Sequence, residues 1–303
     1  METTTPPPVS RAVLAFADEH AMGQALADAL GAPLHLIERH RFPDGELKLT
    51  LPPRLPADVV LLRSLHQPNE KLVELLLTAP AARTLGARRV LLASPYLAYM
   101  RQDMAFTPGE VVSQRHVGGW LAEAFDAVVT VDPHLHRIAA LDEVMPACQA
   151  VSLSAAKALG AWIAQQVPGA LLLGPDEESG QWVRRAAAAA GLDHAVCVKQ
   201  RFGDRDVEVA MPAVDVRGRA VVLMDDMAST GRTLIGAARQ CGALGAASVD
   251  VAVSHALFVG DAMPALRAAG VRHVWSTDCV PHESNVVSVV PLLAGALRDL
   301  MGS

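Results

Sequence analysis

Residues 221–233 read Val221-Val222-Leu223-Met224-Asp225-Asp226-Met227-Ala228-Ser229-Thr230-Gly231-Arg232-Thr233. The four apolar residues predict a buried strand with two carboxylates at its tip, and the Ser/Thr/Gly turn predicts the start of a helix. Such a turn presents backbone N–H groups and hydroxyls to a phosphate monoester. The adjacent acids repel phosphate but suit sugar hydroxyls, or a cation that bridges to them. The segment therefore predicts a site for a ribose 5-phosphate group; the alternative is an acidic strand end followed by an ordinary helix cap.

Strands and helices alternate along the rest of the chain. Short aliphatic runs predict strands at 12–17, 59–64, 89–94, 127–132, 170–174, 220–224, 249–254 and 273–277. Ala/Leu-rich patterns between them predict helices at 72–85, 114–125, 154–166, 181–190 and 233–244. This order predicts an α/β protein with mostly parallel sheets flanked by helices. We expect two domains, residues 1–150 and 151–303, with the last helix free to pack back on the first.

The composition excludes several classes of protein. Of 303 residues, 51% are apolar and 19% charged, which provides an ample core and excludes a disordered chain. A net charge of −6 argues against a broad nucleic-acid surface. The first ten residues hold no apolar secretory core, and no apolar run reaches the ~18 residues of a membrane span. Four cysteines, far apart and without CxxC pairs, favour a reducing cytoplasm.

Polar side chains follow most of the predicted strands. These clusters are Arg63-Ser64, Arg101-Gln102-Asp103, Asp132-Pro133-His134, Pro175-Asp176-Glu177-Glu178, Asp225-Asp226 and Thr277-Asp278. In parallel sheets the carboxyl ends of the strands share one edge, where ligands gather. Six clusters of this kind favour a shared catalytic rim over chance placement.

Further motifs occur in a fixed order along the chain. They are Arg41-Phe42-Pro43-Asp44-Gly45-Glu46, Asn69-Glu70-Lys71-Leu72, Tyr99-Met100-Arg101-Gln102-Asp103, Val131-Asp132-Pro133-His134 and Gly174-Pro175-Asp176-Glu177-Glu178-Ser179. With residues 225–233 and Ser276-Thr277-Asp278, this pattern resembles the ribose-phosphate pyrophosphokinase family over residues 11–300. Pro108-Gly109-Glu110 is more similar to its archaeal-type branch. The resemblance implies two type I phosphoribosyltransferase-like domains, and transfer of the diphosphoryl group of MgATP to the anomeric hydroxyl of ribose 5-phosphate, releasing AMP.

The resemblance also implies a role for the basic pair Lys199 and Arg201, on a mobile catalytic loop. Residues two apart in an extended segment point to the same side and can clamp one phosphate chain. Only four of the 26 basic residues are lysines, so a lysine in this setting is notable. The alternative is a solvated basic turn.

ATP and its metal ion are implied to bind at the ends of other strands. Arg101, with Gln102 and Asp103 beside it, matches the residues that grip ATP phosphates. His134 matches a phosphate contact and, secondarily, a metal ligand, and Asp176 matches a metal-linked aspartate. Mg²⁺ is the implied cofactor, because it prefers carboxylate and phosphate oxygens.

Two further sets of residues complete the implied site. Phe42, Asp44 and Glu46 match a hairpin that recognises the adenine of ATP bound to a neighbouring subunit, which implies a homodimer or higher homo-oligomer. The residues matched to the ribose 5-phosphate site are Asp225, Asp226, Ser229, Thr230, Gly231, Thr233 and Asp278.

One residue departs from the family pattern. Arg232 stands where the family has Gly or Ala, and it can alter the loop or add a cation. A larger ribose 5-phosphoryl acceptor, such as ADP-ribose, is therefore an alternative. Two other readings are a phosphoribosyltransferase, which uses the same loop, and a regulatory homologue without activity.

Overall fold

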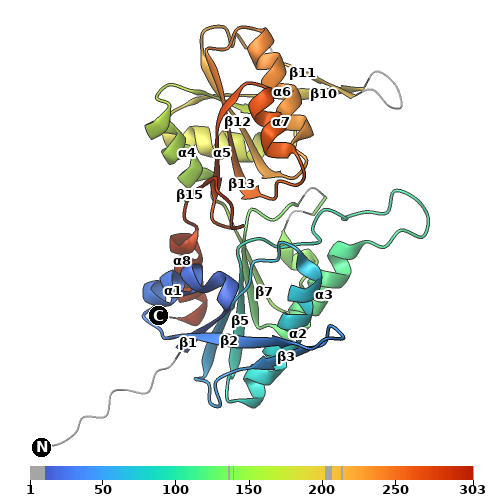
Figure 1. The fold of residues 1–303 in the computed structure, drawn as a ribbon, viewed down its shortest axis with the longest axis vertical. Coiled ribbons are helices and arrows are strands. Elements are labelled where there is room, and N and C mark those ends of the chain that lie inside the picture. The colour runs from blue at the N-terminus through green and yellow to red at the C-terminus, as the bar shows by residue number, and fades with distance from the viewer. Residues whose placement is uncertain (1–10, 136, 139, 202–206, 213, 303) are drawn as a thin grey trace, which may run out of the picture. The chain divides into compact units, whose positions relative to one another are not determined.

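The chain folds into two compact units, seen in the computed structural model (Figure 1), which describes residues 11–135, 137–138, 140–201, 207–212 and 214–302. Unit 1 comprises Met1–Leu153 and Val290–Ser303, and unit 2 comprises Ser154–Val289. The chain thus returns to unit 1 at its end. There, helix α8 (Val290–Met301) contacts helix α1 (His20–Leu30), and Arg298 Nη2 donates to the Ala29 carbonyl at 2.8 Å.

Unit 1 is built on a seven-stranded sheet with the order β3-β2-β1-β4-β5-β6-β7. Its strands are β1 (Arg11–Phe16), β2 (Leu34–Arg41), β3 (Leu47–Thr50), β4 (Asp58–Leu62), β5 (Arg89–Ser94), β6 (Ala127–Val131) and β7 (Gln149–Leu153). All neighbours are parallel except the β2–β3 hairpin. Strands β1, β4, β5 and β6 are almost wholly buried, as expected for parallel strands covered on both faces.

The helices of unit 1 are α1, α2 (Pro68–Thr84), α3 (Ser113–Ala124) and α8, with short 3₁₀ turns η1 (Ala17–Glu19) and η2 (Leu141–Glu143). Within the described residues, no helix has both the length and the apolar character that a bilayer span requires.

Unit 2 contains a six-stranded parallel sheet with the order β15-β14-β13-β12-β8-β9. Its strands are β8 (Leu171–Gly174), β9 (Asp193–Val196), β12 (Ala220–Ala228), β13 (Ser248–Ala256), β14 (Val271–Thr277) and β15 (Asn285–Val287). A separate antiparallel pair consists of β10 (Val198–Arg201) and β11 (Val207–Ala210). The helices are α4 (Ala156–Gln166), α5 (Gly180–Ala190), α6 (Arg232–Ala243) and α7 (Ala262–Ala268).

Strand β12 organises the core of unit 2, because its side chains alternate between two faces. Val221 and Leu223 pack in the cluster that includes α6 and α7, whereas Val222 and Met224 pack with α4 and α5. Helices α4 and α5 touch at Gly160, where a Cβ atom would lie 2.5 Å from the Ala186 carbonyl oxygen. Both layers hold β12 rigidly under the segment that the sequence marks as a phosphate site.

The predicted fold class is confirmed, and all eight predicted strands and five predicted helices are present to within a few residues. One prediction about β12 is wrong: Asp225 and Asp226 lie inside the strand rather than at its tip. The reason is tertiary, because β13 continues to pair with β12 as far as Ala228 opposite Ala256. On the other side β8 stops pairing at Leu173, opposite Leu223, which leaves that flank of the acids open to other groups.

Three non-glycine residues in the described part adopt a left-handed backbone: Gln67 (φ 53°), Tyr99 (φ 63°) and Asp132 (φ 38°). They follow the carboxyl ends of β4, β5 and β6, which are neighbours in the sheet. Such backbone costs about 1–3 kcal/mol per residue and persists where surrounding contacts enforce it, often at functional sites. This edge of unit 1 is therefore a second candidate region.

Candidate functional site

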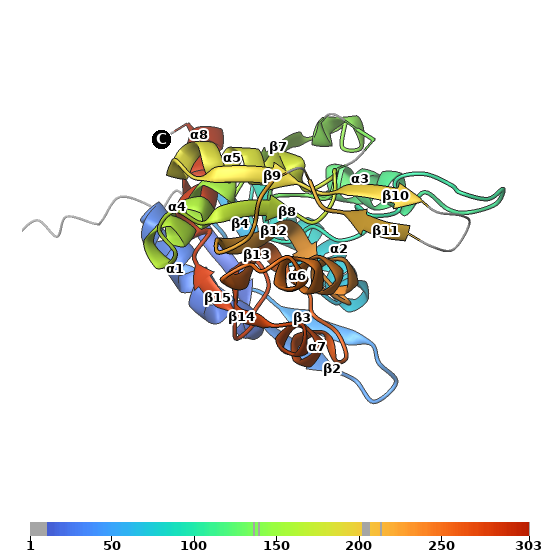
Figure 2. The same ribbon diagram turned by 90° about the horizontal axis from the view of Figure 1, so that it is seen from above.

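The candidate site in unit 2 lies where the direction of its strand order reverses. From β8 the chain moves to β9 on one side, and from β12 to β13 on the other. Strands β8 and β12 themselves lie side by side (Figure 2). In open α/β sheets, ligands bind in the crevice that this reversal creates beyond the carboxyl ends. Asp176 follows β8 by two residues, and Asp225 and Asp226 lie near the end of β12.

These three aspartates are crowded, and two of them are withdrawn from solvent. Asp226 is 3% exposed and Asp176 is 6% exposed. The Asp226 N–H donates to Asp225 Oδ1 at 2.9 Å. Burial raises the pKa of Asp225 well above its ordinary value, and the charges of Asp226 and Asp176 raise it further. Hydroxyl donors or a cation at this place would relieve the repulsion between the carboxylates.

The donor set is chemically suited to Mg²⁺. Asp176 is fixed in place, because its Oδ1 accepts from the Ser179 N–H at 3.1 Å and its carbonyl accepts from the Ser179 hydroxyl at 2.5 Å. Among the described residues no three His, Cys, Asp or Glu side chains form a ready-made metal cage. A bound Mg²⁺ would therefore take one or two carboxylates and complete its shell with phosphate oxygens and water, its usual practice.

The turn after β12 presents backbone donors at a helix N-terminus. Gly231 has φ 69°, a conformation that a side chain would strain, and α6 begins at the next residue. Backbone bonds fix the turn: the Leu257 N–H donates to the Ala228 carbonyl at 3.0 Å, and the Val259 N–H to the Ser229 carbonyl at 3.2 Å. The N-cap residue of α6, Gly231, has no side chain with which to cap the helix, so the first N–H groups are suited to a phosphate.

Arg232 does not distort this turn. It is the first residue of α6 and is exposed, and positive φ occurs at Gly231 instead. An arginine therefore fits here without strain, and its effect is to add a cation beside the turn. Thr230 is exposed, and Ser229 and Thr233 are half-buried.

Asp278 is tied to the backbone. Its Oδ1 accepts from the Val289 N–H at 2.8 Å, and its own N–H donates to the Val287 carbonyl at 3.0 Å. The carboxylate thus holds the last segment of unit 2, a structural task that the sequence did not indicate.

Lys199 and Arg201 lie in β10, opposite Val209 and Val207 of β11. Positions two apart in a strand share a face, in keeping with a clamp. Their side chains, and residues 202–206 between the two strands, lie outside the described part of the chain.

In unit 1, the polar residues after β5 and β6 have different tasks. Arg101 is exposed and makes no hydrogen bond or ion pair within the described residues. Gln102 Nε2 donates to the Met104 carbonyl at 2.9 Å, so its amide shapes the loop. Asp103 has a side chain only 2% exposed, and its Oδ1 accepts from Arg137 Nη1 at 2.6 Å. His134 is half-buried, two residues after the left-handed Asp132.

A buried ion network fills the corresponding reversal point of unit 1, between β1 and β4. Arg63, fully buried, pairs with Asp18 at 2.8 Å, Glu19 at 3.1 Å and Glu74 at 2.5 Å. Glu19 also accepts from the Ser64 N–H at 2.6 Å. Burial lowers the pKa of nearby Lys71 to about 8. The sequence placed Arg63-Ser64 on the rim but did not indicate this network of ion pairs at the reversal point of unit 1.

The hairpin between β2 and β3 carries Phe42, Asp44 and Glu46. Phe42 is 39% exposed, and the His40 ring meets it edge-on at 4.8 Å between centroids. The Glu46 N–H donates to Asp44 Oδ1 at 3.1 Å, which closes the turn. A groove of about 410 Å³ lies between the hairpin and α2, lined by Arg41, Gly45, Glu46, Leu47, Glu70, Val73 and Leu77.

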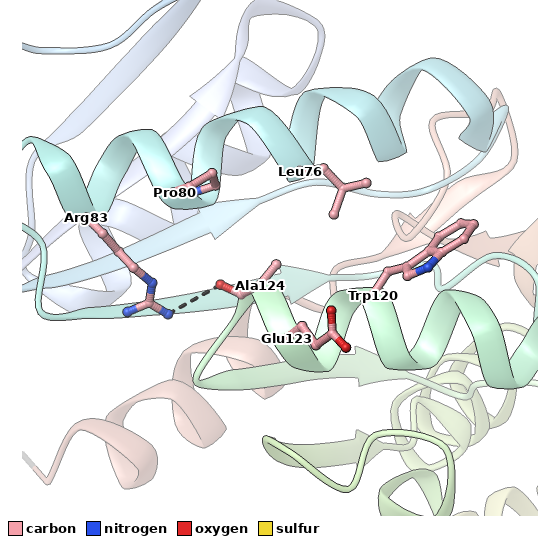
Figure 3. Close-up of a pocket in the computed structure, with 6 residues that line it drawn as sticks. All are labelled: Leu76, Pro80, Arg83, Trp120, Glu123 and Ala124. Atoms are coloured by element: carbon pink, nitrogen blue, oxygen red, sulfur yellow. Dashed lines mark hydrogen bonds between the residues drawn. The ribbon is translucent and has the colours of Figure 1, made fainter.

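A second groove, of about 470 Å³, runs between α2 and α3 (Figure 3). It is lined by Leu76, Pro80, Arg83, Trp120, Glu123 and Ala124. Trp120 is 50% exposed, and Arg83 Nη2 donates to the Ala124 carbonyl at 3.3 Å across the far end of the groove. Adjacent residues of α2, Leu76 and Leu77, line one groove each, so apolar surface extends from the hairpin to α3.

Comparison with known proteins places this arrangement in a family. Residues 12–124 match the family model for the N-terminal domain of ribose phosphate pyrophosphokinase, and residues 149–292 match the phosphoribosyl transferase domain. The ribose-phosphate pyrophosphokinase of Methanopyrus kandleri is 38% identical, covering 96% of this chain and 99% of its own. That of Methanosarcina acetivorans is 34% identical, covering 90% and 94%.

The solved structure of phosphoribosylpyrophosphate synthetase from Mycobacterium smegmatis shares the fold, with a TM-score of 0.82 and 23% identity over 97% of this chain and 99% of its own. The two relatives named above are archaeal, which agrees with the archaeal-type motifs in the sequence. On the evidence of full-length relatives and of both domain matches, the chain belongs to the ribose-phosphate pyrophosphokinase family.

Proposed function

We propose that the protein transfers the diphosphoryl group of MgATP to the anomeric hydroxyl of ribose 5-phosphate, giving 5-phosphoribosyl 1-diphosphate and AMP. The observation that carries this proposal is the segment of unit 2 in which the crowded carboxylates Asp225 and Asp226 are followed, after a short turn, by the N-terminus of α6 at Gly231. Phosphate and vicinal hydroxyls are the two features of ribose 5-phosphate that these groups match. At the corresponding reversal point of unit 1, Arg63 and its three carboxylate partners form buried ion pairs instead.

Each group of the substrates is assigned to residues of suitable charge. The 5-phosphate is bound by the turn residues Ser229, Thr230, Gly231 and Thr233. The ribose hydroxyls donate hydrogen bonds to the carboxylates of Asp225 and Asp226. Arg101 and His134 orient the ATP phosphates, and Lys199 and Arg201 neutralise the oxygens of the group in transit. Asp176 would help to hold Mg²⁺, which when bound supplies further neutralisation of phosphate charge.

An acceptor comparison tests this function. With MgATP present, AMP is expected to form at least about 10-fold faster with ribose 5-phosphate than with ADP-ribose. The reason is that ADP-ribose lacks the free 5-phosphate monoester for which the turn after β12 is suited. ADP-ribose is the second candidate because Arg232 adds an exposed cation beside the turn. Faster AMP formation with ADP-ribose would show that ADP-ribose, and not ribose 5-phosphate, is the acceptor. Conversion of a nucleobase and 5-phosphoribosyl 1-diphosphate without ATP would show that the protein is a phosphoribosyltransferase instead. Binding of ATP without turnover would show that it is a regulatory homologue without activity.

We further propose that the protein is a homodimer or higher homo-oligomer, with a second copy on the apolar surface formed by the two grooves along α2. The proposal is supported because this surface is continuous with the hairpin that carries Phe42. In the family, this hairpin recognises the adenine of ATP bound to a neighbouring subunit. Exposed Val73, Leu77 and Trp120 suit an interface better than water. A cytoplasmic location stays a prediction from cysteine spacing; all four cysteines are free thiols.

Trp120→Asp tests the oligomer. Light scattering of the unaltered protein is expected to give at least twice the 32.0 kDa of one chain, and the variant is expected to give one chain, since a buried charge opposes association. Leu244→Asp, at a 45% exposed site in unit 2, is the control and should leave the mass unchanged. A monomeric wild type with full activity would contradict the proposal.

A further inference from the structure

Two loops at the carboxyl edge of unit 1 carry the candidate ATP contacts. Residues 95–112 follow β5 and include Arg101, and residues 132–140 follow β6 and include His134. Because β5 and β6 pair directly, from Leu91 opposite Ala127 to Ser94 opposite Thr130, the two loops start side by side. Their relative placement therefore determines where Arg101 and His134 stand with respect to one another.

An ion pair joins these loops beyond their base. Arg137 Nη1 donates to Asp103 Oδ1 at 2.6 Å, and the Asp103 side chain is only 2% exposed. The Arg137 guanidinium also lies 5.8 Å from the centre of the Phe106 ring, within the range of a cation–π contact. One side chain from the second loop thus holds the first loop at two points.

The Asp103 carboxylate depends on this arginine. Its other oxygen, Oδ2, is buried and accepts no hydrogen bond within the described residues. Without the Arg137 guanidinium, the buried Asp103 carboxylate would still bear the free-energy cost of its lost hydration, with no cation to offset that cost. The loop that carries Asp103 would then move so that water can hydrate the carboxylate. Because the Asp103 side chain is only 2% exposed and is paired with Arg137, it is poorly placed to meet a nucleotide directly.

The contacts on either side of Arg101 come from its own loop and from helix α3, which follows that loop. The Gln102 amide donates to the Met104 carbonyl at 2.9 Å, and Gln114 Nε2 donates to the Met100 carbonyl at 3.2 Å. They keep the local turn after the left-handed Tyr99 but do not set the distance to the His134 loop. The Arg137–Asp103 pair does, because its two residues lie 34 positions apart, one on each loop.

We propose that Arg137 is a positioning residue, which through Asp103 holds the Arg101 loop against the His134 loop so that both meet the phosphates of the nucleotide. Asp103 then acts as the partner of Arg137 and not as a direct ATP contact. This inference rests on the proposed function, because it takes MgATP to bind at these two loops.

Steady-state kinetics of Arg137→Ala test it. The KM for ATP is expected to rise about 10-fold and kcat to fall several-fold, while the KM for ribose 5-phosphate, which binds in unit 2, stays within about twofold. Arg137→Lys, which keeps a cation opposite Asp103, should recover most of the loss. The matched control is Arg267→Ala, which removes an exposed ion pair to Glu283 in unit 2 and should change neither constant.

A double-mutant cycle separates positioning from direct contact. If Arg137 acts through Asp103, then Asp103→Asn reproduces the Arg137→Ala defect, and the double variant is no worse than either single variant. Additive losses would show that Arg137 touches the nucleotide itself, and unchanged ATP kinetics in Arg137→Ala would show that the pair is only structural. Either result overturns the inference.

Calorimetry with MgATP alone distinguishes this inference from the proposed function. Weaker binding by Arg137→Ala than by the wild type would support positioning even if no acceptor reacted. Turnover by the wild type, with Arg137→Ala unaffected, would remove the inference and leave the function. A wild type that binds no MgATP would overturn both.

Discussion

Lys199→Ala is expected to lower kcat for AMP formation by about 10²- to 10³-fold, the loss typical when one donor to a developing oxyanion is removed. Arg201→Ala should have an effect of similar size, because we propose that Arg201 neutralises oxygens of the same phosphate chain. The melting temperature should change little, since β10 and β11 form a sheet separate from the six-stranded sheet of unit 2.

The control for Lys199 is another of the four lysines. Lys157 is exposed on α4, and Lys157→Ala should keep wild-type turnover. A Lys199→Ala variant that retains half or more of the wild-type kcat would remove the clamp from the account, whatever the effect on stability.

Asp225→Asn is expected to stabilise the fold while it disables the site. Burial and two neighbouring carboxylates raise the pKa of Asp225, which means that its charged form destabilises the native state at neutral pH. Removing that charge should raise the melting temperature by about 3–5 °C per kcal/mol of relief in a unit of this size. The same change should lower kcat/KM for ribose 5-phosphate by about 10²-fold, because an amide is a poorer acceptor for sugar hydroxyls.

The pH dependence fixes the sign of this effect. A carboxyl whose folded pKa exceeds its unfolded value favours the native state as pH falls through the folded pKa, so the wild type should approach Asp225→Asn in stability on acidification. The melting temperatures are compared in EDTA, with Asp299→Asn, on the surface of α8, as the control. A less stable Asp225→Asn at neutral pH would contradict the carboxylate crowding described here.

The strands could be predicted because parallel, doubly covered strands are continuous apolar runs, as in Val59–Leu62. Helix α1 was missed although Leu26, Ala27 and Leu30 bury one face, since Gly23 interrupts the pattern. That glycine is needed where a Cβ would lie 2.9 Å from the Cβ of Ala15. The length of β12 depends on its partner β13, which is information that the local sequence does not contain.

The parts of the candidate site that are built from neighbouring residues of the sequence could be predicted. The contacts between residues far apart in the sequence could not. The turn 229–233 follows from local chemistry alone. The burial of Arg63 among three carboxylates does not, because an arginine next to a serine predicts an exposed rim residue. Asp103 was predicted to bind ATP, but nothing in the local sequence indicates that its charge is directed at Arg137, 34 residues further along the chain.

The most direct test of the account uses ATP labelled with ³²P at the γ position, together with Mg²⁺ and ribose 5-phosphate. Transfer of a diphosphoryl group predicts that the label moves to the sugar as part of a diphosphate, with one AMP formed for each labelled sugar and no ADP. Label recovered in a sugar monophosphoryl product with ADP, or no AMP across several divalent metals, would contradict it.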